Sequence, residues 1–324
     1  MCTVCVWANE DLPCVSSRNM DWFQDMPTNL WALPAGRVVR GAHPDDPLAL
    51  EWTAKYGSIA AVSYGIGSSD GLNEKGLAAS MLWLAESEYG NRDESIPALG
   101  VALWTQYYLD NFATVKEAVE AFEHEPYQVV PAVVAGRTAT VHLQLSDATG
   151  DCAVLEVIDG QVVITHGSEF AVLTNSPTFA EQLTNLRGYV GFGGADPLPG
   201  STEAAARFVR AAYYTRSLPP AENGTMAIAQ ILSVLRNVAQ PFGVIDPARP
   251  NISPTRWRTV RDHENILYFI ESSTSPYMVW LSGKNLDFSA GAPAKVLKLD
   301  ELGQSVGEQS AKLVEEPLFS PAFE

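Results

Sequence analysis

The chain has 324 residues, 46% hydrophobic and 18% charged, a composition typical of a globular protein with a substantial interior. Its 38 acidic residues against 21 basic ones give a formal charge of −17, which argues against nucleic acid or an anionic membrane as a partner. A single domain over residues 1–324 is expected at this length.

The first feature along the chain is Cys2, directly behind the initiator methionine. Removal of Met1 is expected because the cysteine side chain is small, and it leaves a nucleophile and a base on the same carbon. An α-amine has a pKa of roughly 7.7 to 8.0 and a thiol of roughly 8.5. The amine can therefore take the thiol proton during attack, as in N-terminal nucleophile hydrolases. A small second residue is also common for efficient methionine removal alone.

Two short apolar runs, residues 2–7 and 15–22, flank a turn signal around residues 11–13. This pattern predicts a β-hairpin at the start of the chain. Arg18 and Asp21 then lie on the second strand, close to Cys2. A guanidinium near the sulfur favours the thiolate, and a carboxylate can orient the α-ammonium group.

The four cysteines, Cys2, Cys5, Cys14 and Cys152, are too few to indicate a disulfide framework. Cys2 and Cys5 have the spacing of half a redox or zinc site. Residues three apart on a strand face opposite sides, however, and no second such pair follows. No metal and no cofactor is expected, and Cys5 and Cys14 are interpreted as small buried hydrophobes.

In the next part of the chain, residues 58–65 and 76–85 are apolar and predict buried strands, while residues 96–112 and 114–124 have helical spacing. Residues 65–71 resemble a dinucleotide-binding loop. The motif requires its last glycine at position 70, whereas this chain has it at position 71, and no helical pattern follows. We therefore discount that motif.

Residues 140–167 predict three β-rich runs separated by hairpin turns at 147–151 and 159–160. Asn175 follows a short strand at its carboxyl end, and a helix is expected to begin near Pro177. The remaining predicted elements are helices over residues 201–218 and 225–238 and a strand pair over 256–281. This order fits an α+β fold, with two sheets packed face to face between helical layers, αββα.

The histidines are scattered without the spacing of metal ligands and are interpreted as structural or exposed: His43, His124, His142, His166 and His263. A papain-like Cys/His pair is not excluded by spacing, but it leaves Arg18, Asp21 and Asn175 without roles. The acidic segment after Ala290 is expected to be an exposed surface or a packing arm.

Five motifs in order carry a resemblance that covers the chain from residue 2 to about 281. They are Cys2 with residues 18–22, then 71–77, 173–179, 198–200 with 207–211, and 255–257. In these stretches the chain resembles the choloylglycine hydrolase family, which contains bile salt hydrolases and penicillin V acylases. The resemblance implies an N-terminal nucleophile hydrolase sandwich.

The resemblance also implies a role for each of five side chains. Cys2 is the nucleophile and its own α-amine is the base, Arg18 lies against the thiolate, and Asp21 holds the amine. Asn175 donates to the oxyanion, a contribution worth roughly 3 to 4 kcal/mol. Arg256 completes a charged network.

Two departures from bile salt hydrolases bear on the substrate. Trp83 stands where those enzymes have an asparagine, so only its backbone N–H can line the oxyanion hole, and residues 188–199 form a shorter loop. Met20, Trp22 and Trp83 are expected to form an aromatic acyl pocket. An anionic substrate would need local positive charge, for which Arg18, Arg256 and Arg258 are candidates.

Residues 82–87 resemble the Gram-negative branch of the family, in which penicillin V acylases also cleave N-acyl homoserine lactones. The resemblance implies an enzyme of this kind here. A bile salt hydrolase, a hydrolase of lipid or ceramide-like amides, and a catalytically drifted ligand-binding protein remain as alternatives. The expected partner is a small-molecule amide, and the family suggests a homo-oligomer, a tetramer or a dimer. No apolar run reaches the roughly 20 residues that span a bilayer. With no signal peptide visible, a cytoplasmic enzyme is expected, or a periplasmic one if an export signal has been cut off.

Overall fold

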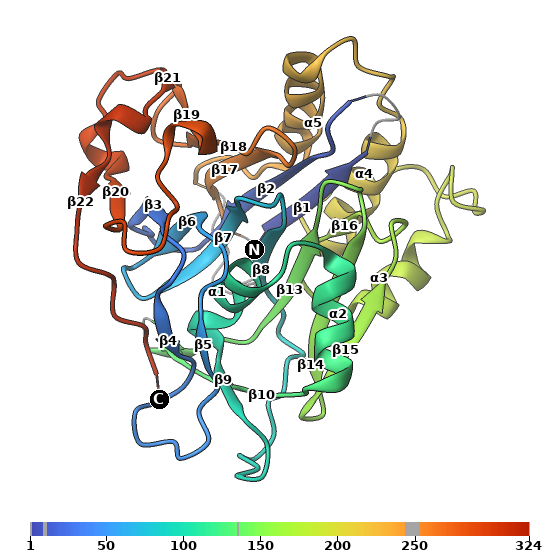
Figure 1. Cartoon of the computed structure of the whole chain (residues 1–324). Coiled ribbons are helices and arrows are strands. Elements are labelled where there is room, and N and C mark those ends of the chain that lie inside the picture. The colour runs from blue at the N-terminus through green and yellow to red at the C-terminus, as the bar shows by residue number, and fades with distance from the viewer. Residues whose placement is uncertain (1, 9–11, 135, 244–252, 324) are drawn as a thin grey trace.

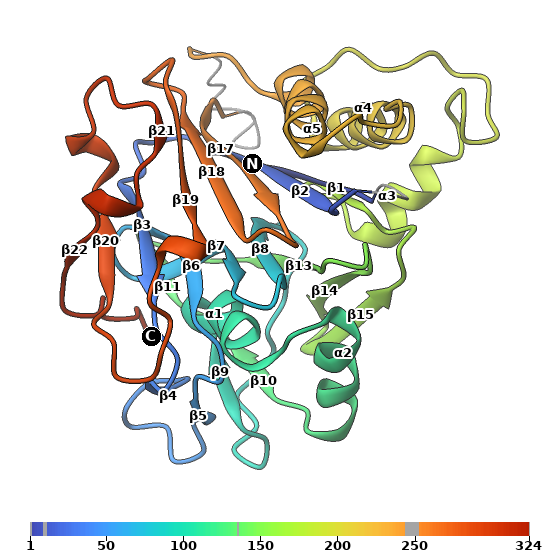
Figure 2. The same cartoon turned by 45° about the horizontal axis from the view of Figure 1, so that its top comes forward.

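Two β-sheets pack face to face, and helices cover the outer face of each sheet (Figure 1). The computed structural model describes residues 2–8, 12–134, 136–243 and 253–323. Turned by 45°, the molecule shows α4 and α5 on one side and α1 and α2 on the other, with both sheets between them (Figure 2). The αββα arrangement predicted from the sequence is confirmed.

The first sheet has seven strands in the order β16-β1-β2-β17-β18-β19-β21. The predicted hairpin is present, because β1 (Cys2–Trp7) pairs antiparallel with β2 (Val15–Asp21). Its predicted turn includes residue 11, which lies outside the described residues. The other strands of this sheet are β16 (Val172–Leu173), β17 (Thr255–Asp262), β18 (Leu267–Ser272), β19 (Met278–Ser282) and β21 (Gly307–Glu308).

The sequence predicted two strands over residues 256–281, and this prediction was wrong. That segment forms three strands, β17, β18 and β19, each antiparallel to the next. Turn residues interrupt the run twice, at 263–266 and at 273–277, whereas the sequence interpretation allowed for one break.

The second sheet has nine strands in the order β15-β14-β13-β8-β7-β6-β3-β20-β22. The three runs predicted between residues 140 and 167 form β13, β14 and β15, and the predicted strands near 58 and 76 form β6 and β8. The bounds are β3 (Thr28–Leu33), β6 (Ser58–Ser63), β7 (Gly67–Asn73), β8 (Ala78–Trp83), β13 (Val141–Ser146), β14 (Cys152–Ile158), β15 (Gln161–His166), β20 (Lys295–Leu297) and β22 (Val314–Glu315).

Strand β7 takes up most of the glycine-rich segment that resembled a dinucleotide loop, and it lies in the interior of the second sheet. Its small residues let a helix approach closely. A Cβ atom added at Gly67 would lie 2.5 Å from the carbonyl oxygen of Ala102 in α1. Only glycine allows the strand and the helix this separation.

Helices α1 (Val101–Asn111) and α2 (Val115–His124) cover the second sheet. Helices α4 (Ala204–Arg216) and α5 (Gly224–Val238) lie against the first sheet, and α3 (Phe179–Leu186) packs on α4. The helix predicted from residue 96 begins five residues later. Residues 98–100 instead form β9 (Ala98–Gly100), which pairs with β10 (Gln128–Val130). Two further pairs are β4 (Val38–Arg40) with β5 (Glu51–Thr53) and β11 (Val133–Val134) with β12 (Arg137–Thr138).

The acidic segment after Ala290 is a packing arm that also completes a sheet. Strand β20 pairs with β3, and Val296 and Leu297 are buried. Farther along, the N–H of Ala322 donates to the carbonyl of Ile66 at 3.3 Å. The glutamates that suggested an exposed surface are exposed: Glu301, Glu308, Glu315 and Glu316.

Among the described residues, no helix combines the length and the apolar character needed to cross a bilayer.

A buried histidine connects the two sheets and predicts a pH dependence of stability. His263 is 1% exposed, and its ring nitrogens lie 2.7 Å from the Gly76 carbonyl and 2.7 Å from the Ser16 hydroxyl. Burial lowers the pKa of His263 to about 4, from an ordinary value of about 6.5. Between these pH values the unfolded chain binds a proton that the native protein does not, so stability falls as the pH falls through this window.

We expect His263 to account for about 3 kcal/mol of the stability lost between pH 6.5 and pH 4. Urea unfolding at a series of pH values measures this loss in the wild type and in His263→Asn. The variant should be less stable at neutral pH and should show a shallower pH dependence. His124→Gln, at an exposed position, is the control. Parallel curves for wild type and His263→Asn would contradict the assignment.

Candidate active site

The thiol of Cys2 lies at the beginning of β1, on the face of the first sheet that packs against the second. The residue is 3% exposed. Its Sγ lies 3.4 Å from Nη2 of Arg18 and 3.6 Å from the sulfur of Met20, both on β2. The register of the hairpin, Cys2 opposite Met20 and Val4 opposite Arg18, brings these groups together. The hairpin thus places a guanidinium in contact with the sulfur.

Arg18 is held by acceptors from the second sheet. The guanidinium is fully buried and donates to the backbone carbonyls of Ser69 and Met81, the latter at 2.5 Å. The Asp70 carboxylate lies 3.7 Å away. Burial lowers the pKa of Arg18, but the charges of Cys2 and Asp70 outweigh burial and hold it above its ordinary value. Arg18 is therefore a fixed cation beside the sulfur.

Asp70 is the centre of a buried polar cluster between the sheets. Its Oδ1 accepts from Ser80 at 2.5 Å and from Arg261 at 2.8 Å. Its Oδ2 accepts from Tyr268 at 2.6 Å and from Thr259 at 3.0 Å. Both carboxylate oxygens are thus satisfied by strands of both sheets, as a buried charge requires. Sequence reasoning did not single out this cluster.

Asn175 follows β16 and reaches Cys2 and Trp83 with the two ends of its side-chain amide. Its Oδ1 accepts from the backbone nitrogen of Cys2 at 2.5 Å. Its Nδ2 donates to the carbonyl of Trp83 at 2.6 Å. The sequence-predicted residues Cys2, Arg18 and Asn175 are therefore brought to one place, with Trp83 beside them.

A buried His–Glu pair supports the loop that carries Asn175. The ring nitrogens of His142 lie 3.0 Å from the Glu156 carboxylate and 2.8 Å from the Thr174 carbonyl. The same carboxylate accepts from the N–H of Phe179 at the first turn of α3. These bonds fix the backbone on both sides of Asn175, so His142 has a structural role there.

Strand register also decides where the N–H of Trp83 points. The N–H of Leu84 donates to the carbonyl of Thr140, so Leu84 faces β13. Residues alternate along a strand, and the two polar groups of one residue point the same way. The N–H and carbonyl of Trp83 therefore both point away from β13, and the carbonyl is the group that Asn175 contacts.

On the opposite, helix-covered side of β1, Asp21 and Arg207 form a second charged group. Asp21 accepts from Thr255 at 2.6 Å and from Gln240 at 3.3 Å, and it lies 3.7 Å from Arg207. Figure 1 shows α4, which carries Arg207, beside the strands β1 and β16.

Arg207 connects Cys2 with Asn175 and Asp21. It is fully buried and donates to the Cys2 carbonyl at 2.6 Å, to Thr3 Oγ1 at 2.6 Å and to Asn175 Oδ1 at 3.1 Å. Burial lowers its pKa, which the charges of Asp21 and Cys2 counteract. This arginine lies in one of the five motifs, residues 207–211, but no role was predicted for it from the sequence. The available signal was its position on the buried stripe of its helix, between Ala204 and Phe208.

The structure does not bring Arg256 into this cluster. Its guanidinium donates to the carbonyls of Trp22 at 2.9 Å and Phe23 at 3.1 Å, and no bond to Cys2 is present among the described residues. A break in register between Thr255 and Trp257 places Arg256 at a β-bulge, which turns it toward the segment after β2. Among the described residues it is Arg207, and not Arg256, that contacts Cys2 and Asn175.

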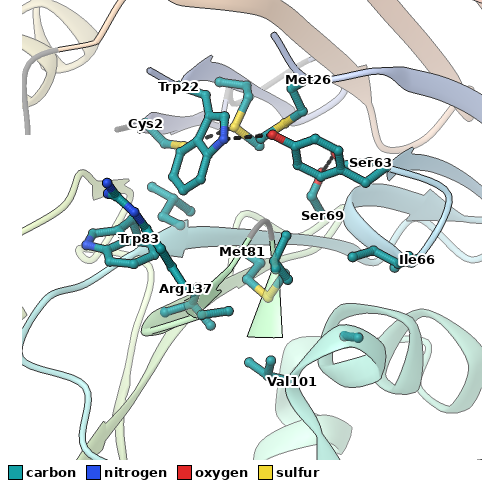
Figure 3. Close-up of a pocket in the computed structure, with 18 of the residues that line it drawn as sticks. Cys2, Trp22, Met26, Ser63, Ile66, Ser69, Met81, Trp83, Val101 and Arg137 are labelled. Carbon is teal, nitrogen blue, oxygen red and sulfur yellow. Dashed lines mark hydrogen bonds between the residues drawn. The ribbon is translucent and has the colours of Figure 1, made fainter. Parts of the chain in front are cut away.

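A pocket opens in front of the thiol, with Met20, Trp22 and Trp83 in its wall as the sequence predicted (Figure 3). Its volume is about 110 Å³ and its lining is mainly apolar. The rings of Trp22 and Trp83 are 5.7 Å apart, and Nε1 of Trp22 donates to the Tyr64 hydroxyl at 2.9 Å. The lining also includes Arg137 and the apolar side chains of Ile66, Met81, Val101, Val134 and Val141.

No group of three or more His, Cys, Asp or Glu side chains is placed to hold a metal ion in the part of the chain that the structure describes.

A family model described as linear amide C–N hydrolases, choloylglycine hydrolase family, matches residues 2–292. The chain belongs to the choloylglycine hydrolase family. It is a hydrolase of linear amide C–N bonds, and the family predicted from the sequence is confirmed.

Two relatives are 44% identical to this member of the choloylglycine hydrolases. A penicillin V acylase of Pectobacterium atrosepticum matches over 311 residues, which are 89% of this chain and 82% of that protein. The structure of a penicillin V acylase from Agrobacterium tumefaciens superposes with a TM-score of 0.91 and covers 99% of this chain and 100% of that one. The predicted fold class is confirmed as well.

Bile acid hydrolases of the family are less similar. A bile salt hydrolase/transferase of Clostridium perfringens is 26% identical over 227 residues, 62% of this chain and 68% of that protein. The structure of a variant of conjugated bile acid hydrolase from Clostridium perfringens shares the fold, with a TM-score of 0.79 at 21% identity over 94% of this chain and 98% of that one.

The contacts of Arg207 predict a loss of turnover when they are altered. Arg207→Lys keeps the charge but cannot reach the Cys2 carbonyl, Thr3 and Asn175 together. We expect kcat for amide hydrolysis to fall about a hundredfold, because small displacements of reacting groups cost rates of that order. Arg210→Lys is the control, since that arginine lies on the same helix and donates to the carbonyls of Pro199 and Ser201. An Arg207→Lys enzyme with wild-type kcat would leave this arginine a purely structural role.

Proposed function

We propose that this hydrolase is a penicillin V acylase that uses Cys2 as its nucleophile after removal of Met1. The observation that carries the proposal is the meeting of the Cys2 thiol, Arg18 and Asn175 at one wall of an apolar, tryptophan-lined pocket. The 44% identity to two penicillin V acylases supports the choice of substrate.

In the proposed reaction the sulfur of Cys2 attacks the amide carbonyl carbon while the thiol proton passes to the α-amine. The tetrahedral intermediate collapses, the C–N bond breaks, and the α-ammonium gives its proton to the leaving amine. Water then attacks the thioester, with the amine as base, and releases the acid and the thiol. The contact of the Cys2 nitrogen with Asn175 Oδ1 would orient the amine, and Asp21 would add to this through Arg207.

We assign the oxyanion to the edge of β8 that faces Asn175. The N–H of Trp83 points to that edge, and Nδ2 of Asn175 already lies there on the Trp83 carbonyl. Donors fixed in advance stabilise a developing oxyanion most effectively, because they need no reorganisation during the reaction. The asparagine that bile salt hydrolases have in place of Trp83 is not needed for this arrangement.

The pocket favours a small aromatic or alkyl acyl group. Its volume of about 110 Å³ is close to that of a cavity of about 150 Å³ known to hold benzene. A steroid nucleus is much larger than one aromatic ring, so penicillin V fits this site better than a bile salt. A long-chain N-acyl homoserine lactone presents a flexible chain to the same walls and is the second expected substrate. A bile salt hydrolase is the alternative.

Assembly as a homo-oligomer, a tetramer or a dimer, is proposed from the family alone. Size-exclusion chromatography with light scattering measures it directly.

The nucleophile is tested by release of free amine from penicillin V, glycocholate, taurocholate and a long-chain N-acyl homoserine lactone. Wild type should cleave penicillin V and the lactone, and Cys2→Ala should cleave nothing while keeping its melting temperature. Cys5→Ala is the matched control, since Cys5 lies on the same strand and burial raises its pKa to about 12. An active Cys2→Ala enzyme would end the proposal, as would inactive wild-type protein shown by mass spectrometry to lack Met1. Dominant cleavage of glycocholate would favour the bile salt alternative.

The acyl pocket is tested at Trp83. Trp83→Ala should raise KM for penicillin V about tenfold or more, because it removes a large apolar wall and the ring contact with Trp22. Trp280→Ala is the control, since that indole packs against Phe269 outside the pocket. Equal effects of the two substitutions would show that Trp83 acts through stability only.

A further inference from the structure

The molecule carries a formal charge of −17, yet penicillin V is an anion. The three arginines expected to offer local positive charge are all engaged. Arg18 is buried on the Ser69 and Met81 carbonyls, and Arg256 donates to the carbonyls of Trp22 and Phe23. Arg258 pairs with Glu271 at 3.2 Å. Their positions leave an anionic substrate to be recognised by another residue.

Arg137 is the other cation in the wall of the pocket. It is exposed, lies on β12, and packs its guanidinium over the ring of Phe23, 4.7 Å from the centroid. No carboxylate of the described residues lies within 4.0 Å of it to form an ion pair. Packing on an aromatic face orients a guanidinium and leaves its N–H groups available to an anion.

A row of rings connects Arg137 with the reacting groups. Phe23 lies 4.9 Å from Trp22, and Trp22 lies 5.7 Å from Trp83, whose carbonyl is bound by Asn175. Figure 3 shows the guanidinium of Arg137 on the same side of the pocket as Trp83 and Cys2. Ile66 and Val101 lie at the other side, which is apolar and suits an acyl group.

We propose that Arg137 binds a carboxylate on the amine half of the substrate. The enzyme would then prefer N-acyl compounds whose released amine is an anion over neutral amides with the same acyl group. This inference rests on the proposed function and deepens it. The apolar end of the pocket holds the acyl group, and the cation beside Trp83 holds the carboxylate in a bidentate contact typical of arginine.

The test compares penicillin V with its methyl ester, which has the same scissile amide and acyl group but no negative charge. KM for both compounds is measured with wild type, Arg137→Lys, Arg137→Ala and Arg137→Glu. Arg216→Ala is the matched control, because Arg216 also packs on an aromatic ring, that of Phe192, but lies outside this pocket.

In the wild type we expect KM for the ester to exceed KM for penicillin V by about tenfold, the size of a charge-assisted contact. Arg137→Ala should remove this preference by raising KM for penicillin V alone, and Arg137→Glu should reverse it. Arg137→Lys should keep part of it, and Arg216→Ala should keep it fully. The effect of Arg137 should weaken as ionic strength rises.

The test distinguishes failure of the carboxylate contact from failure of the proposed function. If the wild type cleaves penicillin V but Arg137→Ala keeps the ratio of the two KM values, or changes both values alike, the carboxylate contact is overturned and the proposed function stands. If processed wild-type enzyme does not cleave penicillin V, the proposed function fails and the inference falls with it.

Discussion

The site depends on one buried guanidinium, that of Arg18, which belongs to the first sheet but is fixed by the second. Its acceptors are two backbone carbonyls and the carboxylate of Asp70. Asp70 in turn accepts from side chains of both sheets. Neither sheet can shift against the other without leaving a charge unpaired in the interior, at a cost of several kcal/mol. The packing of the sheets and the position of the thiol are therefore set by the same contacts.

This arrangement separates Cys2 from the other cysteines. Burial raises the pKa of Cys5 and of Cys14 to about 12, in Cys14 despite the nearby charge of Arg261, and it raises that of Cys152 as well. Those thiols are inert in the neutral range. Cys2 is equally buried, but its sulfur faces the charge of Arg18 and one wall of a pocket. The difference between Cys2 and the other three cysteines therefore lies in the contacts with a guanidinium and with the pocket, and not in exposure.

The parts of the fold that the sequence predicted are those with strong local signals. The hairpin at Cys2 and the three strands between residues 140 and 167 have alternating apolar residues and clear turns. Strand β7 lacked such a signal, because its glycines and serines are selected by the close approach of α1. Arg207 and Asp70 were missed for a similar reason, since a buried charge is recognised only when the acceptors or donors around it are known. The motif resemblance predicted a catalytic role for Arg256, but a β-bulge directs its side chain to the carbonyls of Trp22 and Phe23.

Two segments far apart in the sequence, at Cys2 and at Ala322, lie against the same pocket. Cys2 forms one wall, and Ala322 donates to the carbonyl of Ile66, which lines the opposite side. In the proposed mechanism any residue kept before Cys2 would block the α-amine, and an insertion beside Ala322 would strain the apolar wall. Immobilisation of the enzyme on a support is therefore better directed at a surface loop such as residues 188–199, which lies outside the lining of the pocket.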